Sequence, residues 1–191
     1  MLDFTCPSCN HCESLDIPAL VNVRTNPELK ERIMDGSFFL HECPACGASV
    51  LLKFPFSYVD PDKRFLVRLS GEETRLSLDE DFVGRRVVEV GDLLEKVRIL
   101  DAELDDIAVE LVKYVTANDM NIHTRLWFSK LDPVDGNLTF AYAADGELKA
   151  LSVGAGVYEN CCGIVARTPE FKEKSTGLAL VDDRWIDSFM R

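Results

Sequence analysis

The chain has 191 residues, of which 47% are hydrophobic, and carries a formal net charge of −12 from 33 acidic and 21 basic residues. This length fits one large domain or two small ones, with enough apolar residues for a packed core. The acidic surplus argues against broad binding to nucleic acids or anionic membranes, because those partners are recognised by clusters of basic residues.

Two features favour a cytoplasmic protein. No apolar run approaches the roughly 18 residues of a membrane-spanning helix. The first nine residues, MLDFTCPSC, lack the basic segment and apolar run of a signal peptide. Thiols stay reduced in the cytoplasm, so we expect the seven cysteines to bind metal or to act in redox chemistry rather than to form structural disulfides.

The first half of the chain alternates between predicted strands and one helix. Thr25 or Asn26 can cap a helix whose first residue is Pro27 and which ends before Gly36. In chain order the predicted elements are a strand within residues 14–24, this helix over residues 27–35, a strand–turn–strand unit over residues 38–54, a strand over residues 64–70 and a charged loop over residues 71–84.

A heptad pattern extends over residues 90–114. Apolar side chains recur every seven positions in two rows, Val90, Val97, Leu104 and Leu111, and Leu93, Leu100, Ile107 and Tyr114. We interpret the pattern as one or two amphipathic helices packed on the protein's own sheet, with a break near residues 101–103 if there are two. A coiled-coil seam stays open as an alternative, so this segment could also form a homodimer.

After residue 120 the periodicity changes to that of strands. Residues 124–131 and 137–153 predict strands, and Asp145–Gly146 predicts the turn of a hairpin within the second stretch. Residues 156–167 and 182–190 predict helices. We therefore expect two domains, residues 1–118 and residues 121–191.

Two short motifs, CPSC at residues 6–9 and CPAC at residues 43–46, carry the strongest functional signal. Each turn supplies two thiolates, and two turns together complete four tetrahedral ligands at about 2.3 Å from Zn²⁺. We therefore predict a zinc site at Cys6, Cys9, Cys43 and Cys46. Four thiolates leave no open coordination position, so the site should be structural rather than catalytic.

The residues around the motifs agree with this prediction. Pro7 and Pro44 stiffen the two turns. Asn10 and Gly47 follow the motifs, where a left-handed backbone lets amide hydrogens point at sulfur, and Gly and Asn tolerate that conformation best. The 33 residues between the motifs exceed the usual spacing, but doubling a loop costs only about 0.6 kcal/mol of closure free energy.

Three alternatives stay open for these cysteines. The thiols could be unligated or redox-active. Cys6, Cys9 and Cys12 form a C-x₂-C-x₂-C run that could belong to an iron–sulfur cluster. A zinc site could also use Cys12, His11 or His41 in place of one cysteine.

Together with the two motifs, the segments VNVRTNPELKERIMDG, KFPFSYVD and LLEKVRILDAELDD resemble the CpXC-domain proteins, which are prokaryotic proteins of uncharacterised function. The resemblance covers roughly residues 1–118. It implies the same four cysteines as a metal site and brings no established activity. This chain differs in having Asn10 where glycine is more usual, and in the additional Cys12.

Other candidate residues carry weaker signals. Adjacent Cys161 and Cys162 could suggest a nucleophile, but no histidine lies nearby in the sequence to act as a base. His123 is a lone histidine that we interpret as structural. Trp127 and Trp185 are interpreted as core or partner-facing anchors. The sequence therefore predicts no catalytic residue.

These observations predict an α+β protein. A zinc-ribbon-like, four-cysteine lobe with an inserted helix comes first, followed by a helical segment and a small β-rich C-terminal lobe. The leading hypothesis is a non-catalytic cytoplasmic protein that zinc stabilises and that binds a protein or a small ligand. The alternatives are an enzyme whose active site lies in residues 121–191 and a transcription-related zinc-ribbon protein.

Overall fold

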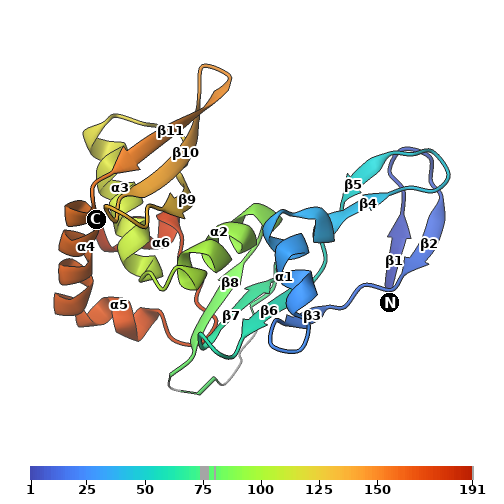
Figure 1. The fold of residues 1–191 in the computed structure, drawn as a ribbon, viewed down its shortest axis with the longest axis horizontal. Helices are drawn as coiled ribbons and strands as arrows, with labels where there is room; N and C mark the ends of the chain where they lie inside the picture. Colours follow the sequence, from blue (N-terminus) through green and yellow to red (C-terminus); the bar gives the residue numbers. More distant parts are fainter. Residues whose placement is uncertain (74–77, 80, 191) are drawn as a thin grey trace.

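The computed structural model describes residues 1–73, 78–79 and 81–190. These residues form an elongated α+β molecule whose elements fall into three groups along its long axis (Figure 1). Two β-hairpins lie at one end, a four-stranded sheet with helices α1 and α2 lies in the middle, and a three-stranded sheet with helices α3 to α6 lies at the other end. The predicted fold class, with a cysteine-bearing N-terminal part and a β-rich C-terminal part, is confirmed.

The two hairpins carry the CPxC motifs in their turns. Strands β1 (Leu2–Thr5) and β2 (Cys12–Leu15) form the first antiparallel pair, and β4 (Leu40–Glu42) and β5 (Ser49–Leu51) form the second. The chain between them forms β3 (Leu20–Asn22), helix α1 (Pro27–Met34) and a 3₁₀ helix (Ser37–Phe39). As predicted, α1 begins at Pro27, and Gly36 follows its end with a φ of 83°.

The middle sheet has the strand order β3-β6-β7-β8. Besides β3, this sheet contains β6 (Phe56–Asp60), β7 (Phe65–Leu69) and β8 (Val83–Val87). Of these three strands, only β7 matches a predicted strand. The sequence of β8 contains two arginines, and Arg85 is buried because Asp106 neutralises it, so the strand lacks an apolar pattern. The predicted charged loop overlaps the start of β8, and its residues 74–77 and 80 lie outside the described residues.

The heptad pattern left open one helix or two with a break near residues 101–103, and the structure has two. Helix α2 (Val90–Asp101) and helix α3 (Asp106–Asp119) are separate, and the Asp105 side chain caps α3 by accepting from Ile107 N–H and Ala108 N–H. Seven of the eight heptad residues are buried within this chain: Val90, Leu93, Val97, Leu100, Leu104, Ile107 and Leu111. A homodimer through residues 90–114 stays a prediction, and it would have to use the remaining faces of these helices.

The C-terminal part begins with a meander of three strands, β9 (Trp127–Leu131), β10 (Leu138–Ala144) and β11 (Glu147–Val153). Asp145 and Gly146 form the predicted hairpin turn, with φ values of 56° and 78°. Helices α4 (Ala155–Arg167), α5 (Pro169–Lys174) and α6 (Asp183–Met190) follow. Helices α4 and α6 match predicted helices, whereas the short helix α5 was not predicted.

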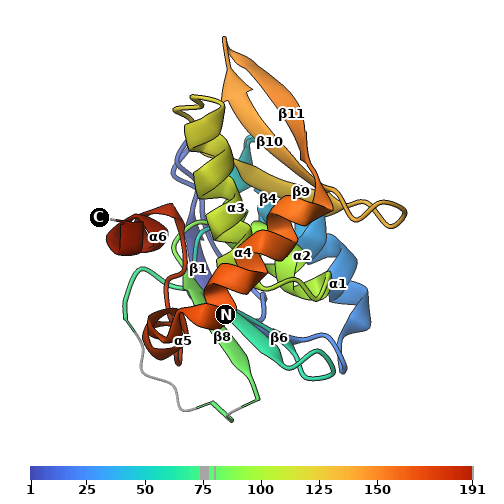
Figure 2. The same ribbon diagram turned by 90° about the vertical axis from the view of Figure 1, so that its left-hand side faces the viewer.

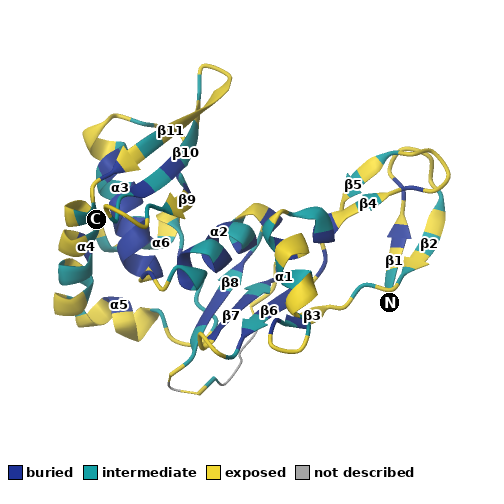
Figure 3. Ribbon diagram, in the orientation of Figure 1, coloured by how far each residue is buried: buried dark blue, intermediate teal, exposed yellow. Residues whose placement is uncertain are grey.

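Two hydrophobic clusters hold these groups together (Figure 3). The first extends from the hairpins through the middle sheet to one face of α2. The second packs α3 against β9, β10 and the C-terminal helices, and takes Ile99 from α2. The boundary between domains near residue 120 stays a prediction. In the described part of the chain, no helix is long and apolar enough to cross a lipid bilayer.

Candidate functional site

The two CPxC turns share one backbone geometry. Asn10 N–H donates to Cys6 O at 2.9 Å, and Gly47 N–H donates to Cys43 O at 2.8 Å. Asn10 and Gly47 have φ values of 59° and 72°, which is the left-handed conformation that the sequence predicted for both. Each hairpin therefore places its two cysteines on one short, closed turn.

The four predicted cysteines converge between the hairpins. Their sulfur atoms all lie within 4.8 Å of one another. Cys6 Sγ lies 3.7 Å from Cys46 Sγ, and Cys9 Sγ lies 3.7 Å from Cys43 Sγ. Sulfur ligands at about 2.3 Å from a tetrahedral ion lie about 3.8 Å from one another, so these four thiols could hold a metal ion. Each short contact joins the two turns, so one ion would link the hairpins.

Backbone amides point at the sulfur atoms. Burial opposes ionisation of Cys6, but hydrogen bonds from the amides of Ser8 and Cys9 outweigh it and lower the pKa of this thiol to about 6. The His11 amide favours the Cys9 thiolate, yet the neighbouring Cys46 sulfur and burial together raise the pKa of Cys9 to about 12. Four thiolates this close repel one another, and a divalent cation would remove that repulsion.

Two of the alternative ligands, Cys12 and His41, make other contacts. Cys12 is exposed in β2, where its sulfur lies 3.5 Å from Thr5 Oγ1. His41 Nε2 lies 2.9 Å from Glu13 Oε1, and the His41 ring packs edge-on against Phe4. His41 thus links β4 to β2 instead of joining the sulfur atoms. These positions favour the four-cysteine set over one that includes Cys12 or His41.

The backbone conformation at Gly47 gives a first testable prediction. A Cβ atom at Gly47 or at Gly71 would meet no atom within 4 Å, but only Gly47 has a positive φ, of 72°. Gly47→Ala should therefore strain the second turn by about 1–2 kcal/mol and weaken metal affinity about tenfold. Gly71→Ala is the matched control and should leave affinity unchanged. Competition with a chromophoric chelator measures both, and equal affinities for the two variants would contradict the prediction.

The structure described so far is that of an α+β protein with two hairpins and an inserted helix. Its cluster of four thiols could hold a metal ion. The profile of the family described as "CpXC protein" matches residues 4–113, which is more than half of the chain. The protein therefore belongs to the CpXC family, as the resemblance predicted.

One relative is an uncharacterized protein of Treponema pallidum (strain Nichols). It is 27% identical over 135 residues, which cover 60% of this chain and 62% of the relative. The alignment thus spans less than two thirds of that protein. No solved structure matches the chain.

The weaker candidates of the sequence lie in different elements. Cys161 is buried in α4, and burial raises the pKa of its thiol. His123 is exposed and lies just before β9. Trp185 packs against Phe171 and Phe189, and Trp127 lies beneath the Arg125 guanidinium at 3.8 Å.

The sequence did not predict a buried network of eight charged side chains where the two hydrophobic clusters meet. Asp106 binds Arg85 through both carboxylate oxygens, at 2.7 and 2.8 Å, and lies 3.0 Å from Lys96. Six of the eight side chains are at most 7% exposed. The network consists of Arg85, Asp92, Glu95, Lys96, Asp106, Glu110, Lys113 and Arg125.

The network stays charged although it is buried. Burial alone would raise the pKa of Asp106, but Arg85 and Lys96 outweigh it and hold this pKa well below its usual range. Burial likewise opposes the charge on Lys113, whose pKa is nevertheless raised by Glu110 and Glu95. Asp106, Glu110 and Lys113 are spaced i, i+4 and i+7 on α3, so they share one face of this helix. This stripe of charges is the sequence feature from which the network could have been predicted.

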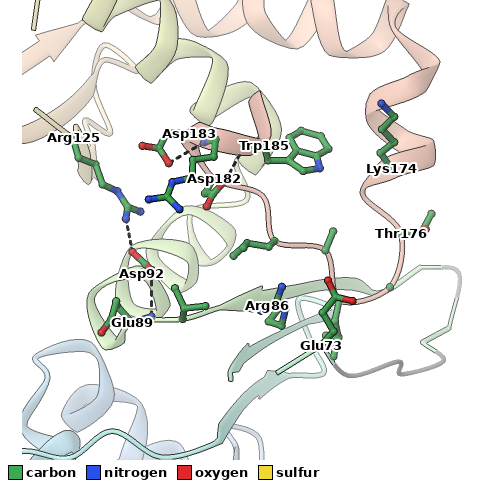
Figure 4. Close-up of a pocket in the computed structure, with 16 residues that line it drawn as sticks. Glu73, Arg86, Glu89, Asp92, Arg125, Lys174, Thr176, Asp182, Asp183 and Trp185 are labelled. Carbon is green, nitrogen blue, oxygen red and sulfur yellow. Dashed lines mark hydrogen bonds and ion pairs between the residues drawn. The ribbon is translucent and has the colours of Figure 1, made fainter. Parts of the chain in front are cut away.

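A cleft of about 1010 Å³ lies beside the network. Figure 4 shows Arg125 bound to Asp92 at one end of the cleft, and Arg86 and Lys174 farther along it. The walls come from β8, the start of α2, residues 176–182 and the start of α6. A neighbouring pocket of about 260 Å³ includes His123 and shares Arg125 with the cleft.

Proposed function

We propose that this CpXC protein is a non-catalytic, cytoplasmic, zinc-stabilised protein that binds a small ligand in the cleft beside the buried charged network. The observation that carries the zinc assignment is the pair of 3.7 Å sulfur–sulfur contacts across the two turns. A tetrahedral four-thiolate set suits Zn²⁺, and it leaves no position for a substrate or a water molecule.

The size of the hairpins supports a structural role for the ion. Each of the four strands has only three or four residues. Isolated two-stranded hairpins are at best marginally stable in water, whereas zinc in small sites contributes about 10–16 kcal/mol of apparent binding free energy. The ion would therefore fix the position of each hairpin relative to the other.

The cleft supports the ligand-binding role. Arg86, Lys174 and Arg184 line it together with Glu73 and Asp183, so its walls present both signs of charge. The Arg86 guanidinium lies 3.5 Å from Ser70 O, which is at the long limit of a hydrogen bond and leaves the group able to bind more strongly to a ligand. A small polar ligand that carries both charges would fit this surface.

Elemental analysis and native mass spectrometry of untagged, full-length protein test both parts of the proposal. We expect one zinc ion per chain, lost in Cys9→Ser and kept in Cys12→Ser, because Cys12 lies outside the cluster. A co-purifying organic mass that Arg86→Ala releases would support binding in the cleft. Iron with inorganic sulfide, or protein without stoichiometric metal, would contradict the zinc assignment.

A further inference from the structure

The hairpin of β10 and β11 projects from the body of the molecule (Figures 1 and 2). Strand β11 is an edge of its sheet, because β10 pairs with β9 on the other side. Residues 147–150 are exposed on both faces of the strand, and Leu148 is 77% exposed. A ribbon exposed on both faces gains little from burial, so a further strand at its edge would stabilise it.

The turn determines which backbone groups face outward. Asp145 and Gly146 both have positive φ, as in a type I′ turn, so Ala144 and Glu147 form the hydrogen-bonded pair that closes the hairpin. Antiparallel pairs alternate between bonded and non-bonded. The residues of β11 in non-bonded pairs, whose N–H and C=O groups point away from β10, are therefore Leu148, Ala150 and Ser152.

An independent contact supports this alternation. Ala143 lies opposite Leu148 in a non-bonded pair, so its carbonyl should point away from β11. It does, because Ala143 O accepts a hydrogen bond of 2.7 Å from Thr124 Oγ1, just before β9. Among the described residues, none outside β10 bonds to the backbone of Leu148, Ala150 or Ser152. Strand β11 thus presents six regularly spaced hydrogen-bonding groups.

We infer that β11 pairs antiparallel with β11 of a second copy of this chain, joining the two three-stranded sheets into one of six strands. The charge of this strand favours self-association here over self-association through the acidic surfaces elsewhere on the molecule. The whole chain carries −12, but β11 contains one Glu and one Lys and is neutral. Two copies can therefore approach along this edge without the repulsion that their other surfaces produce.

One register satisfies every outward group. With Ala150 on the two-fold axis, it bonds to its own symmetry copy, and Leu148 bonds to Ser152 of the other copy. Lys149 then faces Leu151, and Glu147 faces Val153, so no like charges lie directly opposite one another. This interface is separate from the four cysteines and from the heptad residues.

Amide hydrogen exchange followed by NMR tests the pairing on wild-type, metal-loaded protein. The amides of Leu148, Ala150 and Ser152 should become protected as protein concentration rises. Those of Lys149 and Leu151 should be protected at every concentration, because they bond to β10. Protection that rises equally along the strand, or that excludes Ser152, would overturn the proposed register.

Sedimentation of two variants tests the interface itself. Ala150→Pro removes an outward N–H and should weaken dimerisation at least about tenfold. Ala150→Val keeps that N–H and should leave the dimer intact. Trp127 fluorescence checks that β9 and its neighbours stay folded. A monomer at all concentrations, or a dimer that Ala150→Pro leaves unchanged, would overturn self-pairing; in the monomer case, a strand from another protein would be the remaining occupant.

Discussion

Cys43→Ser is expected to release the metal and to unfold both hairpins. Cys43 is 1% exposed, and its sulfur lies 3.7 Å from that of Cys9 in the other turn. Serine offers a poor ligand for zinc and leaves three crowded thiols without a full coordination shell. Zinc in small sites contributes about 10–16 kcal/mol, which is as large as the whole stability of a typical domain, about 5–15 kcal/mol.

Two measurements separate a local from a global effect. Hydrogen exchange followed by mass spectrometry should show loss of protection in residues 2–15 and 40–51. Fluorescence of Trp127 and Trp185 should change little under mild conditions, because Trp127 lies in β9 and Trp185 packs against the second hydrophobic cluster, and neither lies in the hairpins. Chelation of wild-type protein should reproduce the result.

The matched control is Cys12→Ser, which changes an exposed cysteine beside the same turn. This variant should keep its metal and its exchange pattern. Retention of stoichiometric zinc by Cys43→Ser would show that another residue completes the coordination, and would contradict the four-cysteine assignment.

Local features of the sequence predicted the cluster of four cysteines and the β10–β11 turn. The spacing of the cysteines and the positive φ at Asn10 and Gly47 depend on only a few neighbouring residues. The same holds for Asp145–Gly146. Strand β8 could not be predicted in this way, since Arg85 is tolerated inside the protein only because Asp106, 21 residues later, binds it.

The heptad pattern also failed to predict features that depend on residues far apart in the sequence. It correctly predicted two apolar faces, but it left open whether one helix or two would carry them. It did not show that Glu95, Lys96, Glu110 and Lys113 would also be buried, because their burial depends on pairing between the two helices. Hydrophobic periodicity treats a charged position as solvent-exposed, and a buried ion pair violates that assumption.

Asp106→Asn is expected to destabilise the protein by about 3–5 kcal/mol, because it leaves Arg85 and Lys96 buried without their shared carboxylate. Asparagine keeps the size and one acceptor oxygen, so the loss measures charge rather than packing. The matched control is Asp62→Asn. Asp62 binds Arg24 at the surface with both side chains more than half exposed, and such pairs contribute only about 0–1 kcal/mol. Urea unfolding monitored by tryptophan fluorescence gives both values.

The pH dependence tests the same prediction by a second route. The pKa of Asp106 is lowered in the folded protein, so the unfolded chain binds more protons than the native one below about pH 4. The stability that Asp106 contributes is therefore fully present above that pH and is lost as pH falls through the folded pKa. The difference between wild-type and Asp106→Asn should shrink below about pH 4, whereas the small effect of Asp62→Asn should stay small. A difference that is constant across this range would mean that the carboxylate acts through its shape alone, and the ionic account of the network would fail.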